Sequence, residues 1–236
     1  MKDNKKYELV KEDTITTKKG RVLSRIKAIK DVRDEKGRLV VPAGTLGGYV
    51  ETEDNLSHED GAWIADNARV FDGAFVSGDA LISGDSQVYG DARISGNAKV
   101  RDNAKVHVHA NVSDNAKVYG KADVYGYARV SGFARIYRNA RVHGSCIVRD
   151  HAEVYGSANI TNEAKIYGNA RVHGQAEVFN WAHVHDNAKV HGSSRIYGGI
   201  HIRYEQVVSG GEIFCGDYIS SGDEEIDGFT IYDEPN

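Results

Sequence analysis

Residues 92–118 read ARISGN AKVRDN AKVHVH ANVSDN AKV, and this hexad pattern is the strongest indication of the fold. It extends outward in both directions: from Ala62 to Ser194 every sixth residue is Ala, Ser or Cys, at 23 consecutive positions without insertion or deletion. Two residues after each of these positions stands Ile or Val. A fixed short period of this kind indicates a repeat protein, in which each unit buries its apolar face by stacking on its neighbours.

The spacing within one hexad predicts a short strand followed by a corner. In an A-x-V triplet the two apolar side chains face one way and the middle one faces the other. The positions that follow are mostly Gly, Asp or Asn, which tolerate the positive φ of a tight corner. Three hexads would close one triangular 18-residue coil, and stacked coils would pair as parallel strands. We therefore predict an all-β fold, a parallel β-helix.

Caps are expected at both ends, because an open coil exposes unpaired strand edges. The strand-like runs Tyr7–Thr17 and Arg21–Val32 predict an N-terminal β-hairpin. We divide the chain into a hairpin cap (1–45), the β-helix (46–203) and an acidic, irregular C-terminal β cap (204–236), which has nine acidic residues and no Lys or Arg.

The ends of the repeat carry three further expectations. The first coil should start near Leu46 and slip around residues 57–60. In the first regular coils, large apolar residues stand at outward positions, so the hairpin or a partner should cover them; they are Trp63, Phe71, Phe75 and Leu81. In the last coil we expect residues six apart to point inward, one residue out of register with Ile202; they are Val207, Ile213 and Ile219.

Composition excludes several classes of protein. Of the 236 residues 27% are charged and 40% apolar, the mean hydropathy is −0.49, and no apolar run is long enough to span a membrane. The opening MKDNKKYELVKED lacks the apolar segment of a signal peptide, so we expect a cytoplasmic protein. Two cysteines, and no carboxylate set beside the His-x-His pairs, indicate neither a disulfide framework nor a metal site.

The hexads resemble those of the proteins that form left-handed parallel β-helices, many of which are trimeric CoA-dependent acyltransferases. The closer resemblance is to a YdcK-like, transferase-labelled group of bacteria and phages. It is carried by Leu46-Gly47-Gly48-Tyr49-Val50-Glu51, by Asn55-Leu56-Ser57 and by strings such as Gly168-Asn169-Ala170-Arg171-Val172. The resemblance implies a left-handed coil and a trimer.

Residues 18 apart should stand above one another in columns on the outside of the coils. The position between Ala and Val is basic in 12 of the 23 hexads and acidic in three, so a wall could hold an anion. The next outward columns are rich in Tyr and His, whose rings could stack on one another or on a nucleotide-like ligand. The candidate ligand-binding residues are Arg93, Arg129, Lys165, Tyr127, Trp181, His183 and His185.

Large apolar residues at outward positions in mid-repeat predict an oligomer interface. Tyr127, Phe133, Ile147 and Trp181 stand where other hexads hold mainly polar residues. Closed cyclic symmetry is the usual outcome, and the resemblance favours a homotrimer. We do not expect a membrane or duplex nucleic acid as a partner.

Three functions from different classes remain open. The first is a non-catalytic oligomeric binding protein whose subunit seams hold an anionic small molecule or a host protein, and the phage side of the resemblance implies a phage-encoded protein. The second is an acyltransferase using acetyl-CoA or another acyl-CoA; the resemblance then implies a histidine general base, with His107, His109 and His143 as candidates. No loop interrupts the hexads, whereas those enzymes typically cover the site with one. The third is a structural spacer.

Overall fold

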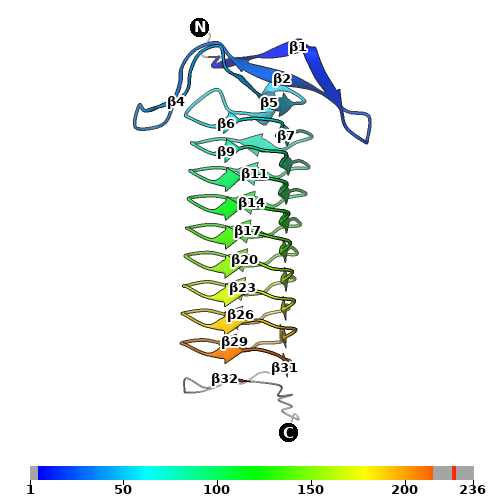
Figure 1. Cartoon of the computed structure of the whole chain (residues 1–236), viewed down its shortest axis with the longest axis vertical. Coiled ribbons are helices and arrows are strands. Elements are labelled where there is room, and N and C mark those ends of the chain that lie inside the picture. Colours follow the sequence, from blue (N-terminus) through cyan, green and yellow to red (C-terminus); the bar gives the residue numbers. More distant parts are fainter. Residues whose placement is uncertain (1–4, 215–224, 227–236) are drawn as a thin grey trace. The chain divides into compact units, whose positions relative to one another are not determined.

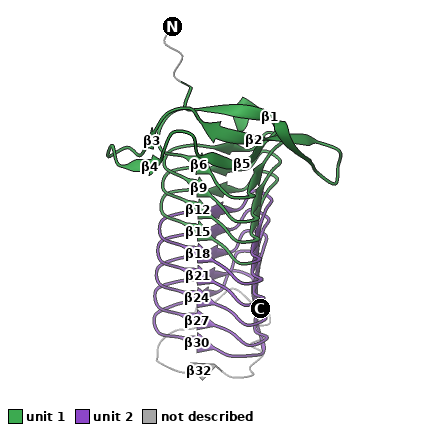
Figure 2. Cartoon of the chain, turned by 45° about the horizontal axis from the view of Figure 1, so that its top comes forward, with its two compact units in different colours: residues 1–120 green, residues 121–236 purple. Residues whose placement is uncertain are grey.

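The structure, a computed structural model, describes residues 5–214 and 225–226 (Figure 1). The chain divides into two compact units, residues 1–120 and 121–236, which Figure 2 shows in different colours. In the described ranges the regular elements are β-strands, apart from one 3-10 turn, η1 (Glu53–Asn55). The all-β fold is confirmed.

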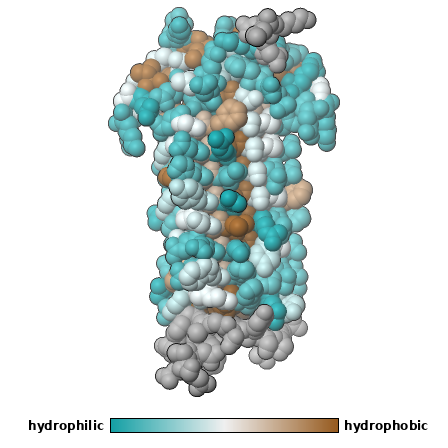
Figure 3. Space-filling model, turned by 180° about the vertical axis from the view of Figure 1, so that it is seen from behind, coloured by the Kyte–Doolittle hydropathy of each residue, from teal (hydrophilic) through white to brown (hydrophobic). Residues whose placement is uncertain are grey.

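Each hexad forms a short strand, of two residues in nearly every case, and a corner, as its pattern predicts. Ala128 and Val130 are fully buried, whereas Arg129 between them is exposed. Gly132, at the following corner, has a φ of +66°, a left-handed conformation that glycine adopts at little cost. The outward positions are mainly polar, and hydrophilic side chains cover most of the face drawn in Figure 3.

Strands one coil apart pair in parallel, which confirms the 18-residue coil. In each regular pair the partners are 18 positions apart, as in Gln87↔Lys105 of the first unit and Arg129↔Ile147 of the second. Successive strands along the chain join three different sheets, so the coil has three sides. The fold is therefore a parallel β-solenoid.

The first unit contributes strands to each of the three sheets. One sheet contains β5 (Leu46–Val50), β7 (Arg69–Val70), β10 (Gln87–Val88) and β13 (Lys105–Val106). The second contains β8 (Phe75–Val76), β11 (Arg93–Ile94) and β14 (Asn111–Val112). The third contains β6 (Trp63–Ile64), β9 (Leu81–Ile82), β12 (Lys99–Val100) and β15 (Lys117–Val118).

The second unit repeats this arrangement. One sheet contains β16 (Asp123–Val124), β19 (Arg141–Val142), β22 (Asn159–Ile160), β25 (Glu177–Val178), β28 (Arg195–Tyr197) and β31 (Glu212–Phe214). The second contains β17 (Arg129–Val130), β20 (Ile147–Val148), β23 (Lys165–Ile166), β26 (His183–Val184) and β29 (His201–Ile202). The third contains β18 (Arg135–Ile136), β21 (Glu153–Val154), β24 (Arg171–Val172), β27 (Lys189–Val190), β30 (Val207–Val208) and β32 (Glu225–Ile226).

The predicted N-terminal hairpin is present. β1 (Tyr7–Thr16) and β2 (Val22–Ala28) pair antiparallel, and β2 also pairs antiparallel with β5, so the hairpin continues the sheet of the first coil. The second predicted strand is shorter than the run to Val32. A second, small hairpin of β3 (Val32–Arg33) and β4 (Leu39–Val41), which the sequence pattern does not predict, follows it.

The first coil is longer than the others. Val50 pairs with Val70 and Leu56 with Val76, each two positions beyond the regular register, whereas Ile64 pairs with Ile82 in that register. Two extra residues therefore lie between Leu56 and Ile64, which agrees with the slip expected around residues 57–60.

The buried side chain of Lys6 links the N-terminal segment to the irregular part of the first coil. The ammonium group of Lys6 donates hydrogen bonds to the carbonyls of Glu59, Asp60 and Ala62 at 3.0, 3.0 and 2.9 Å. Burial lowers the pKa of Lys6 to about 8. The three carbonyls satisfy a charge that would otherwise be costly to bury.

Two of the four large apolar residues of the first coils, Trp63 and Phe71, are buried. Phe71 packs in a buried cluster with Leu23 of β2 and Tyr49 of β5, so the hairpin supplies the cover. Trp63 is also buried, while Phe75 and Leu81 are half-buried.

One expectation for the last coil is wrong. Val208, not Val207, is buried, because the pairing of Val190 with Val208 keeps the 18-residue register. The register changes only afterwards: Arg195 pairs with Glu212, one position short of the regular partner, and this brings Ile213 inward as predicted. Ile219 and most of the acidic cap lie outside the described residues.

Candidate functional site

Most of the predicted site residues gather on one sheet of the second unit. We call the outward surface of β17, β20, β23, β26 and β29, with the turns at its two edges, the β17–β29 wall. Parallel register places one outward residue of each strand in a single column, in the order Arg129, Ile147, Lys165, His183 and His201. The predicted ligand residues Arg129, Lys165 and His183 thus share a surface with the predicted interface residue Ile147.

The β17–β29 wall differs in charge from the other two sheets of this unit. Its described strands carry no Asp or Glu at the outward position. On the other sheets, outward carboxylates neutralise neighbouring cations: Glu153 pairs with Arg135 at 3.3 Å, and Glu177 with Arg195 at 3.1 Å. The cations of the wall lack such partners on its strands, so positive charge stays uncompensated along the column.

A second column on the wall combines a guanidinium with stacked rings. Arg149 lies over the ring of Tyr167, 4.7 Å from its centroid. The Tyr167 ring stacks in turn on His185, with centroids 4.8 Å apart and planes 3° from parallel. Asp150 and Asp186, at the adjoining corner, pair with Arg149 and His185 at 3.2 Å each. These two carboxylates therefore lie at the edge of the β17–β29 wall and not on its strands.

Three histidines meet at the C-terminal end of the wall. Nε2 of His185 lies 3.3 Å from Nδ1 of His201, and the rings of His183 and His201 are 4.4 Å apart. Burial, followed by the charges of His201, Lys165 and His185, lowers the pKa of His183 to about 4. Burial and nearby cations also lower the pKa of His201. His183 is therefore neutral at pH 7, and its buried Nδ1 has no hydrogen-bond partner in the described structure.

Exposed aromatic residues mark one edge of the wall. Tyr127 and Trp181 occupy the turns before β17 and β26 and are 63% and 62% exposed. The indole Nε1–H of Trp181 donates to Oε2 of Glu163 at 2.6 Å. Beside them is an open hollow of about 340 Å³, lined by Gly144, Ser145, Asn162, Glu163, Asn180 and Trp181.

Phe133 lies at the opposite edge, in the turn after β17. It is 53% exposed and stacks on His151, with centroids 5.0 Å apart. Ile147 is half-buried in the middle of the sheet. The four predicted interface residues therefore lie across the wall and at both of its edges, with cations between them.

Three predicted residues belong to the first unit. Arg93 is exposed on β11. His107 stacks on Tyr89, with centroids 4.6 Å apart and planes 3° from parallel. Nδ1 of His109 lies 3.5 Å from Oδ2 of Asp91, and both side chains are exposed. A carboxylate at this distance could orient an imidazole that acts as a base.

His143 is engaged at both ring nitrogens. Nε2 lies 3.0 Å from Oδ1 of Asn159, Nδ1 lies 3.0 Å from Oγ1 of Thr161, and the ring stacks on Tyr125 at 4.6 Å. Burial lowers its pKa. A general base needs a ring nitrogen that can accept a proton from the substrate. In this arrangement both nitrogens of His143 already have partners, so the ring has a structural role.

Sequence reasoning did not select Arg149, Tyr167 and His201 as site residues. Arg149 and Tyr167 stand one coil apart in the column that leads to His185, and that column was the available signal. His201 is harder to find, because its hexad has Ile200 in place of alanine.

The described residues contain neither a metal-binding cluster nor a membrane-spanning helix. No group of three or more His, Cys, Asp or Glu side chains there is arranged to hold a metal ion. Nor do these residues include a helix with the length and apolar character needed to span a bilayer.

Three parallel sheets of short strands around an Ala- and Val-lined interior define the class: a β-solenoid repeat protein. Residues 74–90 and 86–102 match the model of the YdcK β-solenoid repeat family. The chain is accordingly a YdcK-like β-solenoid repeat protein, as the resemblance of its hexads implies. The comparison with curated proteins gives no match.

Proposed function

We propose that the protein is a non-catalytic, oligomeric binding protein that uses the β17–β29 wall both to assemble and to hold an anionic small molecule. The observation that carries this proposal is the column Arg129, Ile147, Lys165 and His183, in which two cations flank an apolar residue, a neutral histidine follows, and none of these strands carries a carboxylate. Interfaces typically surround an apolar core with a polar rim.

The assembly part rests on exposed aromatic surface. Tyr127, Phe133 and Trp181 are each more than half exposed, and clusters of such groups mark interaction surfaces. Tyr and Trp are enriched at protein interfaces. A ring of identical subunits buries the same wall in each copy, and the resemblance favours three subunits.

The binding part rests on charge and stacking. Guanidinium and ammonium groups recognise phosphate and carboxylate, and Arg129 and Lys165 supply one of each on the strands of this wall. Tyr167 and His185 add an aromatic surface beside them. These features favour a nucleotide-like ligand at a seam between subunits. A host protein on the same wall is the alternative occupant.

Light scattering tests the assembly. The wild type should have the mass of a closed oligomer, and Ile147→Asp with Trp181→Ser should reduce it to about one chain. Arg171→Asp with Lys189→Ser, exposed on another sheet of the same unit, is the matched control and should leave the mass unchanged. A monomeric wild type would overturn the proposal.

Ligand identity is tested by denaturing the purified protein and analysing the released small molecules by mass spectrometry. A nucleotide that copurifies with the wild type, and is lost from Arg129→Ala with Lys165→Ala, supports the binding function. If no anion is released from the wild type, and Arg129→Ala with Lys165→Ala keeps the full mass of the oligomer, the structural spacer is favoured.

A second candidate function, CoA-dependent acyl transfer, is favoured by the pair Asp91–His109 alone. Loss of a general base typically lowers a rate about 10²- to 10⁴-fold. An acceptor screen with acetyl-CoA and succinyl-CoA should therefore show turnover that His109→Ala abolishes. Equal signals from the two proteins would exclude His109 as the base.

A further inference from the structure

A second hollow lies in the first unit, far along the sequence from the β17–β29 wall and independent of it. It has a volume of about 250 Å³ and is bounded by the β1–β2 turn on one side and by β7 and β10 on the other. Its lining residues are Thr17, Lys18, Lys19, Arg69, Phe71, Gln87 and Tyr89. We call it the hairpin pocket.

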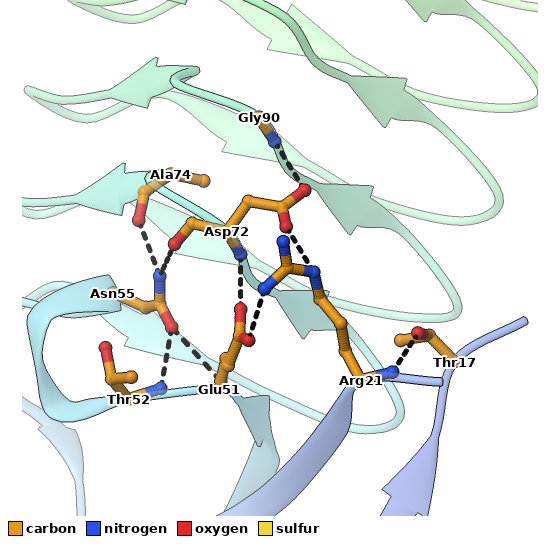
Figure 4. Close-up of polar contacts among 8 residues, drawn as sticks. All are labelled: Thr17, Arg21, Glu51, Thr52, Asn55, Asp72, Ala74 and Gly90. Carbon is orange, nitrogen blue, oxygen red and sulfur yellow. Dashed lines mark hydrogen bonds and ion pairs between the residues drawn. The ribbon is translucent and has the colours of Figure 1, made fainter. Parts of the chain in front are cut away.

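The turn that forms one side of this pocket is fixed in place. Nη1 of Arg21 lies 2.7 Å from Oε1 of Glu51, and its Nε lies 2.6 Å from Oδ1 of Asp72, as Figure 4 shows. The backbone N–H of Arg21 also donates to Oγ1 of Thr17 at 3.1 Å. Arg21 thus joins the hairpin to the first coil and neutralises the two nearby carboxylates.

The remaining cations of the pocket keep their charge uncompensated. In the described structure no carboxylate forms an ion pair with Lys18, Lys19 or Arg69. The two lysines are exposed in the turn, and Arg69 extends from β7 as a half-buried side chain. Three positive groups around one hollow make a site for an anion, with Arg69 able to bind phosphate oxygens through two N–H groups at once.

The other wall of the pocket is aromatic and rigid. Phe71 is held by Leu23 and Tyr49 in a buried cluster, and it stacks on Tyr89 with centroids 5.1 Å apart and planes 4° from parallel. Tyr89 stacks further on His107. Gln87 of β10, the parallel partner of Arg69, also lines the pocket, and its amide can donate or accept a hydrogen bond.

We propose that the hairpin pocket binds a phosphate-bearing molecule with one aromatic ring, of the class of the nucleoside monophosphates. The phosphate lies among Lys18, Lys19 and Arg69, and the ring lies against the edges of Phe71 and Tyr89. Anionic charge and a flat apolar body are the two features that this pocket complements, the first through its three cations and the second through its two aromatic rings.

Calorimetric titration of the full-length protein with adenosine monophosphate tests the proposal, with inorganic phosphate and adenosine as separate probes. The monophosphate should bind about tenfold or more tightly than either fragment, since it alone reaches both walls. Lys18→Ala with Lys19→Ala should weaken binding about tenfold or more without changing thermal stability, because both side chains are exposed.

Lys99→Ala with Lys117→Ala provides the matched control, since these lysines lie on another sheet of the same unit. This variant should bind like the wild type. Inorganic phosphate that binds as tightly as the monophosphate would overturn the role of the aromatic wall. No saturable binding at millimolar monophosphate, or equal binding by the Lys18/Lys19 variant, would overturn the site. Neither outcome depends on the β17–β29 wall.

Discussion

The indole Nε1–H of Trp181 donates a hydrogen bond of 2.6 Å to Oε2 of Glu163, which lies one coil earlier in the chain. This bond holds a large aromatic ring in one orientation although the ring is 62% exposed. A fixed side chain loses less conformational freedom on binding, which favours its use at an interface.

This arrangement predicts the response of tryptophan fluorescence to a quencher. Trp63 is buried in the chain, so quenching by acrylamide reports on Trp181. If the β17–β29 wall is covered in the oligomer, acrylamide should quench the wild type weakly and the Ile147→Asp variant strongly. Strong quenching of both proteins would show that Trp181 faces solvent in the assembly.

The stability of the first coil should depend on Asn55. This buried amide accepts hydrogen bonds from the N–H groups of Glu51 and Thr52 and donates to the carbonyls of Asp72 and Ala74, all between 2.9 and 3.1 Å (Figure 4). Asn55→Asp turns the donor end into an acceptor facing two carbonyls. Because each unsatisfied buried group costs about 1–3 kcal/mol, we expect a loss of about 2–4 kcal/mol in chemical denaturation.

The control for this prediction is Asn97→Ala. Asn97 is exposed at a corner of the same unit, and its loss should change stability by about 0.5 kcal/mol or less. Comparable losses in the two variants would mean that the four bonds of Asn55 contribute little.

Acid should destabilise the protein through His183. Its pKa in the folded chain is about 4, below the usual value of about 6.5 for an unfolded chain. Between these values the unfolded state binds more protons, so the stability present above pH 6.5 is lost as the pH falls toward 4. His183→Gln should reduce the dependence of melting temperature on pH between 7 and 4. Parallel curves for variant and wild type would contradict the assignment.

One corner residue should carry backbone strain. Val108 has a φ of +65°, whereas most corners of the first unit have Gly or Asp at this place. A left-handed conformation costs a β-branched residue about 1–2 kcal/mol, and asparagine tolerates it better. Val108→Asn should therefore raise the free energy of unfolding by about 1 kcal/mol. The reverse change at an equivalent corner, Asp102→Val, should lower it, and a gain there would refute the argument.

The thiol of Cys146 should be inert. It occupies an alanine position, is fully buried, and donates to the carbonyl of His143 at 3.1 Å. Burial raises its pKa to about 12, so little reactive thiolate forms at neutral pH. In a Cys215→Ser background, a thiol reagent should label the denatured protein rapidly and the native protein slowly. Equal rates would mean that the alanine column does not point inward.

The candidate site could be predicted only in part. The 18-residue period places Arg129, Lys165 and His183 in one column without any structure, and the register confirms it. The period could not show that His201 approaches His185, because this depends on ring orientations in an irregular hexad. It also could not show that both nitrogens of His143 are engaged.

The six-residue period alone is enough to predict the β-solenoid, because its uninterrupted repetition turns every Ala and Val side chain to the same, inner side of the coil. It also determined the 18-residue columns, since three sides close one coil. The position of the hairpin could be learned from the folded chain alone, because the pairing of β2 with β5 and the ion pair of Arg21 with Asp72 join segments that share no sequence period. The hairpin pocket arises from that placement, so its cations and its aromatic wall meet only in the folded chain.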